Sequence, residues 1–282
     1  MQVLLLAAVI ILCAAQNVLA KQYDRLASDK NVFFFSGITS LAALLFFAVS
    51  AGFRLTFSTD YLPYAIAFGV SYAVGGITIF YALAWGSMSI TGLVTSYSLI
   101  IPTFYGLIAL GERLSSAGVI GVICLMVSLF LINDSSEQTR FSLKWVACLV
   151  LAFVANGMCS TVQKMQQLAC SGGYKHDFMI VALIIVTAAS FLMAALRREK
   201  IASSLGLSLT LGALKGVANG IVNLLVMLLT GVIANAILFP SISAGGIVLG
   251  FIIAVAVYKE RLSRCQLIGY AIGTPSVVLL NL

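Results

Sequence analysis

The chain has 282 residues, of which 61% are hydrophobic and only 9% are charged. Soluble domains are about a quarter charged and under half apolar, so this composition excludes an ordinary soluble domain, a disordered chain and a coiled coil. The net charge of +7 is spread over short connections, which is typical of membrane orientation and not of a nucleic-acid-binding surface.

Long apolar segments predict ten membrane-spanning helices, because a span needs about 20 mostly apolar residues. Two charge-poor segments, 61–111 and 201–258, are each long enough for two helices, with breaks expected at residues 85–87 and near 230–231. The first run lacks the basic start of a secretory signal, so we expect it to remain as a helix. No run alternates as β-barrel strands do, so the expected fold is all-α. The predicted helices are 2–20, 32–51, 62–84, 88–110, 115–132, 143–163, 178–196, 206–229, 232–257 and 265–282.

An internal repeat relates the two halves of the chain. The segment Glu112-Arg113-Leu114-Ser115 recurs 148 residues later as Glu260-Arg261-Leu262-Ser263, and further identities follow at the same shift. We therefore divide the chain into a five-helix repeat at 1–133, a hydrophilic linker at 134–144 and a second five-helix repeat at 145–282. Because five is odd, the second repeat enters the membrane inverted, as in many transporters with a central cavity. The alternative is a duplicated packing unit without transport. The further identities are Ile120/Ile268, Gly121/Gly269, Ser128/Ser276, Leu131/Leu279 and Asn133/Asn281.

The repeated motif closes the fourth span as Gly111-Glu112-Arg113-Leu114 and the ninth as Lys259-Glu260-Arg261-Leu262. With this motif and ten spans in two repeats, the chain resembles EamA-type members of the drug/metabolite transporter superfamily. The resemblance implies a basket of helices around a central cavity and alternating access by rocking of the two halves. It does not identify the substrate, and Lys259 departs from the glycine that would match.

The distribution of basic residues and the resemblance give opposite orientations. Eleven Lys and Arg follow odd-numbered spans and four follow even-numbered spans, so the positive-inside rule puts both termini outside. The resemblance implies termini inside, and both orientations remain open. The eleven are Lys21, Arg25, Lys30, Arg140, Lys144, Arg197, Arg198, Lys200, Lys259, Arg261 and Arg264; the four are Arg54, Arg113, Lys164 and Lys175.

The eighth span carries the main candidate site. Lys215 is the only formal charge well inside a predicted span, and Asn219 and Asn223 follow at spacings of four on the same face. A lysine at the bilayer centre costs about 2.5–3.5 kcal/mol, so we expect it to face a cavity and hold an anionic or zwitterionic group. The alternative is a lysine that snorkels to the helix end. A second stripe, Gly212, Gly216 and Gly220, predicts close packing against a neighbouring helix.

Other spans supply weaker candidates. Asn156 and Ser160 in the sixth span and Asn17 in the first are expected to donate hydrogen bonds to substrate, and Tyr72 and Tyr97 to offer ring surfaces. Pro102 is expected to kink the fourth span. In the tenth span, Gly269 and Gly273 form a GxxxG pair that is compatible with a homodimer or with packing against the fifth span.

These features predict a secondary transporter of the cell membrane that moves a small polar metabolite, amino-acid-like or otherwise anionic or zwitterionic, by alternating access. The alternatives are a multidrug or cation exporter of the same superfamily and a non-transporting sensor or partner subunit. Small multidrug relatives carry a glutamate in their first span, whereas residues 11–17 here contain no acid, which disfavours the exporter. No motif favours an enzyme or a cofactor. With one histidine and no CxxC pair among six cysteines, a metal site is not expected.

Overall fold

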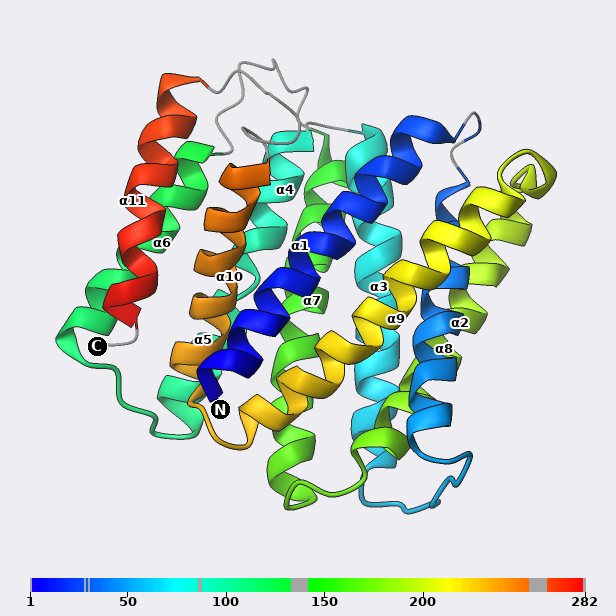
Figure 1. Ribbon diagram of the computed structural model, residues 1–282, viewed down its shortest axis with the longest axis horizontal. Coiled ribbons are helices and arrows are strands. Elements are labelled where there is room, and N and C mark those ends of the chain that lie inside the picture. The colour runs from blue at the N-terminus through cyan, green and yellow to red at the C-terminus, as the bar shows by residue number, and fades with distance from the viewer. Residues whose placement is uncertain are drawn as a thin grey trace. The chain divides into compact units, whose positions relative to one another are not determined.

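The computed structural model describes residues 2–27, 29, 31–85, 88–132, 142–253 and 263–280. All regular structure within them is helical. Most of the predicted linker 134–144, the second motif at 259–262 and the paired position Asn281 lie outside the described residues. The helices are α1 (Gln2–Leu26), α2 (Val32–Ser50), α3 (Leu62–Trp85), α4 (Met88–Tyr97), α5 (Ile100–Phe104), η1 (Tyr105–Ala109), α6 (Ser116–Ile132), α7 (Leu143–Ala169), α8 (Lys175–Leu196), η2 (Ile201–Ser203), α9 (Leu205–Thr230), α10 (Asn235–Ile252) and α11 (Arg264–Leu280) (Figure 1).

Six of the helices are long and apolar enough to cross a membrane: α1, α2, α3, α7, α8 and α9. Each carries a window of mean hydropathy between 1.6 and 2.6. Their composition and length indicate a membrane protein. Large apolar side chains on their outer faces are exposed, for example Val3, Leu4, Leu192 and Leu214, as expected where lipid replaces water as the solvent.

The chain forms two compact units. Unit 1 comprises residues 1–73 and 162–231, and unit 2 comprises residues 74–161 and 232–282. Each unit therefore draws segments from both halves of the sequence, and α3 and α7 each contribute residues to both units. The compact units do not follow the boundaries of the two predicted repeats.

In unit 1, α2 packs against both α8 and α9, and α1 packs against α9. The glycine stripe of α9 makes the contact with α2. A Cβ atom on Gly216 would lie 2.2 Å from the carbonyl oxygen of Thr39, and one on Gly220 would lie 2.6 Å from the Phe46 ring. Because no side chain larger than a hydrogen fits there, the two backbones approach closely, and the predicted packing role of this stripe is confirmed.

The fourth predicted span is more interrupted than the single kink expected at Pro102. The structure ends α4 at Tyr97, starts α5 at Ile100 and continues into the π-helical turn η1. Proline has no N–H for the Ser98 carbonyl, and its ring crowds that carbonyl. The Ser98 oxygen instead accepts from Ile101 N at 3.1 Å, which tightens the turn. At the far end, Leu110 N donates to Tyr105 O and so widens the turn.

In unit 2, α11 packs on α6 and α10. Leu125, Leu129 and Ala244 form the buried centre of this contact, with Tyr97 and Tyr270 against its edge. A second cluster gathers Trp145 and Leu149 of α7 around Ala82 of α3. Both clusters are apolar, which contrasts with the helix contacts around α9.

Candidate functional site

One face of α9 carries polar residues along its whole length. Ser208, Lys215, Asn219, Asn223 and Thr230 follow at spacings of seven, four, four and seven. At 100° per residue these positions lie within an arc of about 80°, and they cover about 33 Å of helix. This length is close to the roughly 30 Å thickness of a bilayer's hydrocarbon core. A polar stripe thus runs through a helix that is otherwise apolar enough to span a membrane.

The central part of the stripe is a directed chain of side-chain amides from three helices. Gln163 Nε2 donates to Asn223 Oδ1 at 2.9 Å, and Asn223 Nδ2 donates to Asn219 Oδ1 at 3.1 Å. Asn219 Nδ2 then donates to Gln16 Oε1 at 3.1 Å. The chain therefore links α7, α9 and α1, and it leaves one amide donor group at Gln16 and one amide acceptor at Gln163 as its two ends.

Lys215 lies one turn before this chain, about 15 Å from the start of α9. Its side chain is half-buried, and Nζ lies 5.2 Å from the centre of the Phe35 ring. Phe35 in turn stacks on Tyr23, with ring centroids 4.0 Å apart. The amine thus points from its backbone position toward the start of α9, as expected for a helical side chain, and away from Asn219. The Asp24 carboxylate of α1 lies close enough to interact electrostatically with the amine.

A second lysine, Lys164, lies within a helix that is long and apolar enough to span a membrane. Lys164 was assigned to a connection after a sixth span ending at residue 163, but α7 continues to Ala169. Lys164 is buried inside this helix, and its Nζ donates to the Thr230 carbonyl at 2.7 Å. A cation at the last carbonyls of a helix is favoured by hydrogen bonding and by the helix dipole. The sixth predicted span was ended too early because the polar run after Lys164 resembles a loop, whereas Lys215 as the only charge well inside a span stays a prediction.

The remaining candidates in unit 1 differ in their exposure and in their contacts. Asn17 is exposed, whereas the neighbouring Gln16 is 8% exposed and makes the contact with Asn219. Tyr72 is half-buried and its ring stacks on Phe68 at 5.9 Å. Gln16 could have been found in the sequence, because it is the amide next to Asn17 in the same span and the stripe on α9 requires an amide partner.

Three candidates belong to unit 2. Asn156 Nδ2 donates to the Ala152 carbonyl of its own helix at 2.8 Å, and Ser160 is half-buried one turn later. The Tyr97 hydroxyl donates to the Met126 carbonyl of α6 at 2.6 Å. Tyr97 therefore bonds the backbone of a neighbouring helix in this structure, and its predicted use as a ring surface for substrate remains a prediction.

The glycine pair of the tenth span lies inside the chain. Gly269 and Gly273 are both buried, and a Cβ atom on Gly269 would lie 2.8 Å from Ile132 Cγ1 of α6. Ser128 Oγ of α6 donates to the Gly269 carbonyl at 2.8 Å. For Gly269 the structure therefore bears out packing against the fifth predicted span, and a homodimer through this pair would have to displace α6.

In the first copy of the repeated motif, Glu112 makes hydrogen bonds with the end of η1 and with the first turn of α10. Glu112 N donates to the Gly106 carbonyl in η1, and Glu112 Oε2 accepts from Ala236 N in the first turn of α10, both at 3.0 Å. A carboxylate at a helix N-terminus satisfies an unpaired N–H and stabilises the positive end of the helix dipole. The motif glycine Gly111 has φ +63°, the left-handed region that glycine adopts without strain.

Among the described residues, no group of three or more His, Cys, Asp and Glu side chains could hold a metal ion. All six cysteines are described and free, and only Cys265 is exposed. The chemistry available around α9 is therefore hydrogen bonding by amides and attraction of negative charge by lysine.

Comparison with known proteins supports the fold without naming an activity. No family model matches the sequence. The chain is 25% identical over 285 residues to a protein of Haemophilus influenzae described as an uncharacterized protein, across 96% of this chain and 95% of that one. A protein of known crystal structure has a similar fold, with a TM-score of 0.75 and 13% identity, across 99% of this chain and 95% of its own. At this identity the likeness concerns the fold alone.

Proposed function

We propose that this protein is a secondary transporter of the cell membrane that moves a small polar metabolite by alternating access. The observation that carries the proposal is the polar stripe along α9, with the amide chain at its centre. Polar and ionisable groups are costly in a membrane helix, and those that face the interior of a helix bundle are a default hypothesis for a functional site. A stripe about as long as the hydrocarbon core is thick gives a polar solute hydrogen-bonding partners throughout its passage.

The substrate class follows from the chemistry of the stripe. Amides offer donors and acceptors without net charge, and Lys215 adds a positive charge whose amine lies over the Phe35 ring, with the Asp24 carboxylate near enough to interact with it electrostatically. An anionic or zwitterionic solute would place its carboxylate or phosphate near Lys215 and its neutral polar groups along Asn219 and Asn223. Amino-acid-like solutes match this combination best.

An inverted repeat is the architecture that we infer for this function, and the burial of α6 and α11 supports it. Gly121, Leu125 and Ser128 of α6 are buried, as are the residues 148 positions later, Gly269, Gly273 and Ser276 of α11. Exposed positions of the two helices also match at this shift, for example Ile120 in α6 and Ile268 in α11. The shift of 148 found in the sequence therefore also relates the buried faces.

The glycine contacts in unit 1 support the same inference. A Cβ atom on Gly216 of α9 would meet the backbone oxygen of Thr39 in α2. A Cβ atom on Gly69 of α3, 147 positions earlier, would lie 2.8 Å from the backbone oxygen of Ala182 in α8. The third and eighth predicted spans would then pack in the same way on the seventh and second, as a twofold pseudosymmetry requires. Ten spans and membership of the EamA-type drug/metabolite transporters are part of this proposal.

Substrate-stimulated counterflow with purified protein in proteoliposomes tests the function. A thermal-stability screen against metabolite pools first finds solutes that bind the folded protein, since such ligands raise its Tm. We expect an amino-acid-like hit to exchange across the vesicle membrane when the same solute is inside. A hit that raises Tm but never exchanges would overturn the transporter and favour the sensor subunit.

A further inference from the structure

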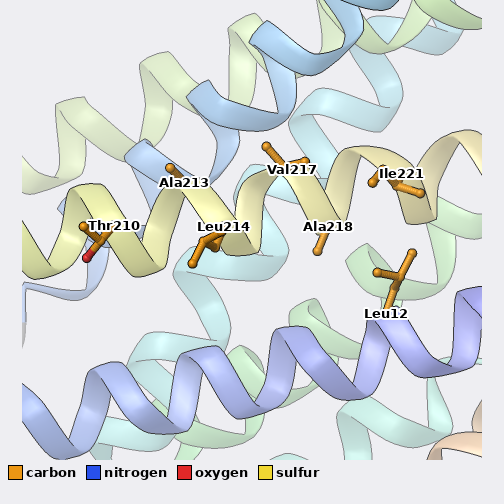
Figure 2. Close-up of a pocket in the computed structure, with 7 residues that line it drawn as sticks. All are labelled: Leu12, Thr210, Ala213, Leu214, Val217, Ala218 and Ile221. Atoms are coloured by element: carbon orange, nitrogen blue, oxygen red, sulfur yellow. The ribbon is translucent and has the colours of Figure 1, made fainter.

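A groove opens between α1 and α9 on a different face of α9 from Lys215. Its volume is about 550 Å³. Figure 2 shows Leu12 of α1 facing Ala218 and Ile221, with Leu214 pointing toward α1. The single hydroxyl in its wall, on Thr210, donates to backbone carbonyls of its own helix, at Gly206 and Leu207. The groove therefore offers only apolar surface to a ligand. Its lining is Leu12, Thr210, Ala213, Leu214, Val217, Ala218 and Ile221.

The groove has the length of one lipid leaflet. From Thr210 to Ile221 the helix rises about 16 Å, and half of a bilayer's hydrocarbon core is about 15 Å. Leu214 and Val217 are 60% and 43% exposed, so the groove opens outward from unit 1. One end lies about five residues from the start of α9, and the other lies near the helix centre.

The outer end of the groove lies beside a basic surface, which we call the basic rim and define as residues 21–27, 29 and 197–200. The basic rim carries five basic and three acidic residues. The Glu199 carboxylate accepts from Phe33 N and Phe34 N at 3.0 and 2.8 Å. The basic residues are Lys21, Arg25, Arg197, Arg198 and Lys200.

Hydrogen bonds fix the two segments of the basic rim at the start of α9. Asn31 Nδ2 donates to the Lys200 carbonyl and to Ser204 Oγ, the residue just before α9, at 2.8 and 2.6 Å. Ser208 Oγ donates to the Tyr23 hydroxyl at the end of α1 at 3.3 Å. Positive charge therefore lies at the outer end of a leaflet-long apolar groove.

We propose that this groove binds one acyl chain of an anionic phospholipid, whose phosphate headgroup contacts the basic rim. Basic residues next to membrane helices attract anionic lipids by about 1 kcal/mol each. Both segments of the rim lie at the same end of α9, so a lipid in the leaflet at that end places its anionic headgroup beside them. A second copy of the chain fits the groove less well, because copies in the same membrane orientation bring their basic rims to the same level. This proposal is independent of transport.

The test uses the purified full chain and three probes of stated composition. Nanodiscs of dioleoylphosphatidylglycerol and of dioleoylphosphatidylcholine have the same acyl chains and differ in headgroup charge. Inorganic phosphate supplies the anion without the chain, and native mass spectrometry after delipidation and addition of either phospholipid counts retained lipid. We expect phosphatidylglycerol, and neither phosphatidylcholine nor phosphate, to raise Tm and to remain bound.

Variants separate the groove from the rim. Ala213→Phe fills the groove and should abolish retention, and Val217→Trp repeats this test at an exposed position if the first variant does not fold. Leu228→Phe, at a 42% exposed position of α9 outside the groove, should retain lipid as the native chain does. Arg198→Gln should weaken phosphatidylglycerol binding about fivefold. Equal retention of both phospholipids, equal stabilisation by phosphate, or a groove variant that alters oligomeric mass and leaves lipid binding intact would each overturn the proposal.

Discussion

The helix contacts around α9 in unit 1 and the contact between α6 and α11 in unit 2 are both close, but they are built from different chemistry. Around α9, glycines face α2, amides face α1 and α7, and the Lys215 amine lies over the Phe35 ring of α2. Between α6 and α11, leucines and glycines fill the contact, and Ser128 supplies a hydrogen bond to Gly269. Unit 2 thus demonstrates that this chain can pack helices closely with little polarity. The amides of unit 1 are therefore not needed for close packing, and we propose solute passage as their role.

The largest expected effect is on Lys215. Lys215→Ala should lower uptake into proteoliposomes at least a hundredfold, because it removes the charge that attracts the anionic group of the substrate, while Lys215→Arg should retain part of the activity. Folding is followed by gel filtration and Tm of the same preparations. Full uptake by a folded Lys215→Ala protein would remove Lys215 from the site and favour the snorkelling explanation.

The next largest expected effect is on stability, at the glycine contact between α9 and α2 in unit 1. Gly216→Ala places a methyl group 2.2 Å from the Thr39 carbonyl, so α2 and α9 must move apart. Overpacking of this kind costs about 1–3 kcal/mol. Thermal unfolding in detergent measures it, with Gly246→Ala as the control, because a Cβ atom there meets nothing within 4 Å. Equal Tm for the two variants would contradict the close contact of α2 and α9.

A smaller loss is expected from the middle of the amide chain. Asn219→Leu removes the donor to Gln16 and the acceptor for Asn223, so uptake should fall about tenfold as substrate loses its aligned amides. Asn17→Leu, at an exposed position of α1, is the matched control and should leave uptake unchanged. If the two variants were equally active, the amide chain would only join helices.

The same comparison explains what the sequence could predict. The stripe of Gly212, Gly216 and Gly220 was predictable because its function depends on spacing alone, and α2 is indeed its partner. Gln16 was not distinguished from Asn17, because a one-residue difference turns a side chain by about 100° and the rotation of α1 about its axis is set by packing. Lys164 was missed because a buried lysine bound to a helix C-terminus has the same local sequence as one in a loop.

The interruption of the fourth span has a similar cause. Pro102 predicted a kink, but the place where the helix actually breaks depends on which carbonyls find other donors. Ser98 finds Ile101, and Glu112 closes the segment by bonding both Gly106 and Ala236. The last of these contacts joins residues more than a hundred positions apart, which local sequence does not specify.

The smallest expected effect is in unit 2, at the contact between α6 and α11 that is contrasted with the polar contacts of α9. Ser128→Ala removes the hydrogen bond to the Gly269 carbonyl, which in membrane proteins contributes about 0.6 kcal/mol on average. Tm should fall slightly and uptake should not change. Ser276→Ala, whose hydroxyl bonds the Gly273 carbonyl of its own helix, should change Tm even less. Because the two serines occupy matching buried positions, the difference between them measures the bond between helices and not the burial of a hydroxyl.

A loss of uptake in Ser128→Ala as large as that in Asn219→Leu would mean that the α6–α11 contact takes part in transport. The proposed division between a polar transport face around α9 and an apolar packing contact between α6 and α11 would then fail.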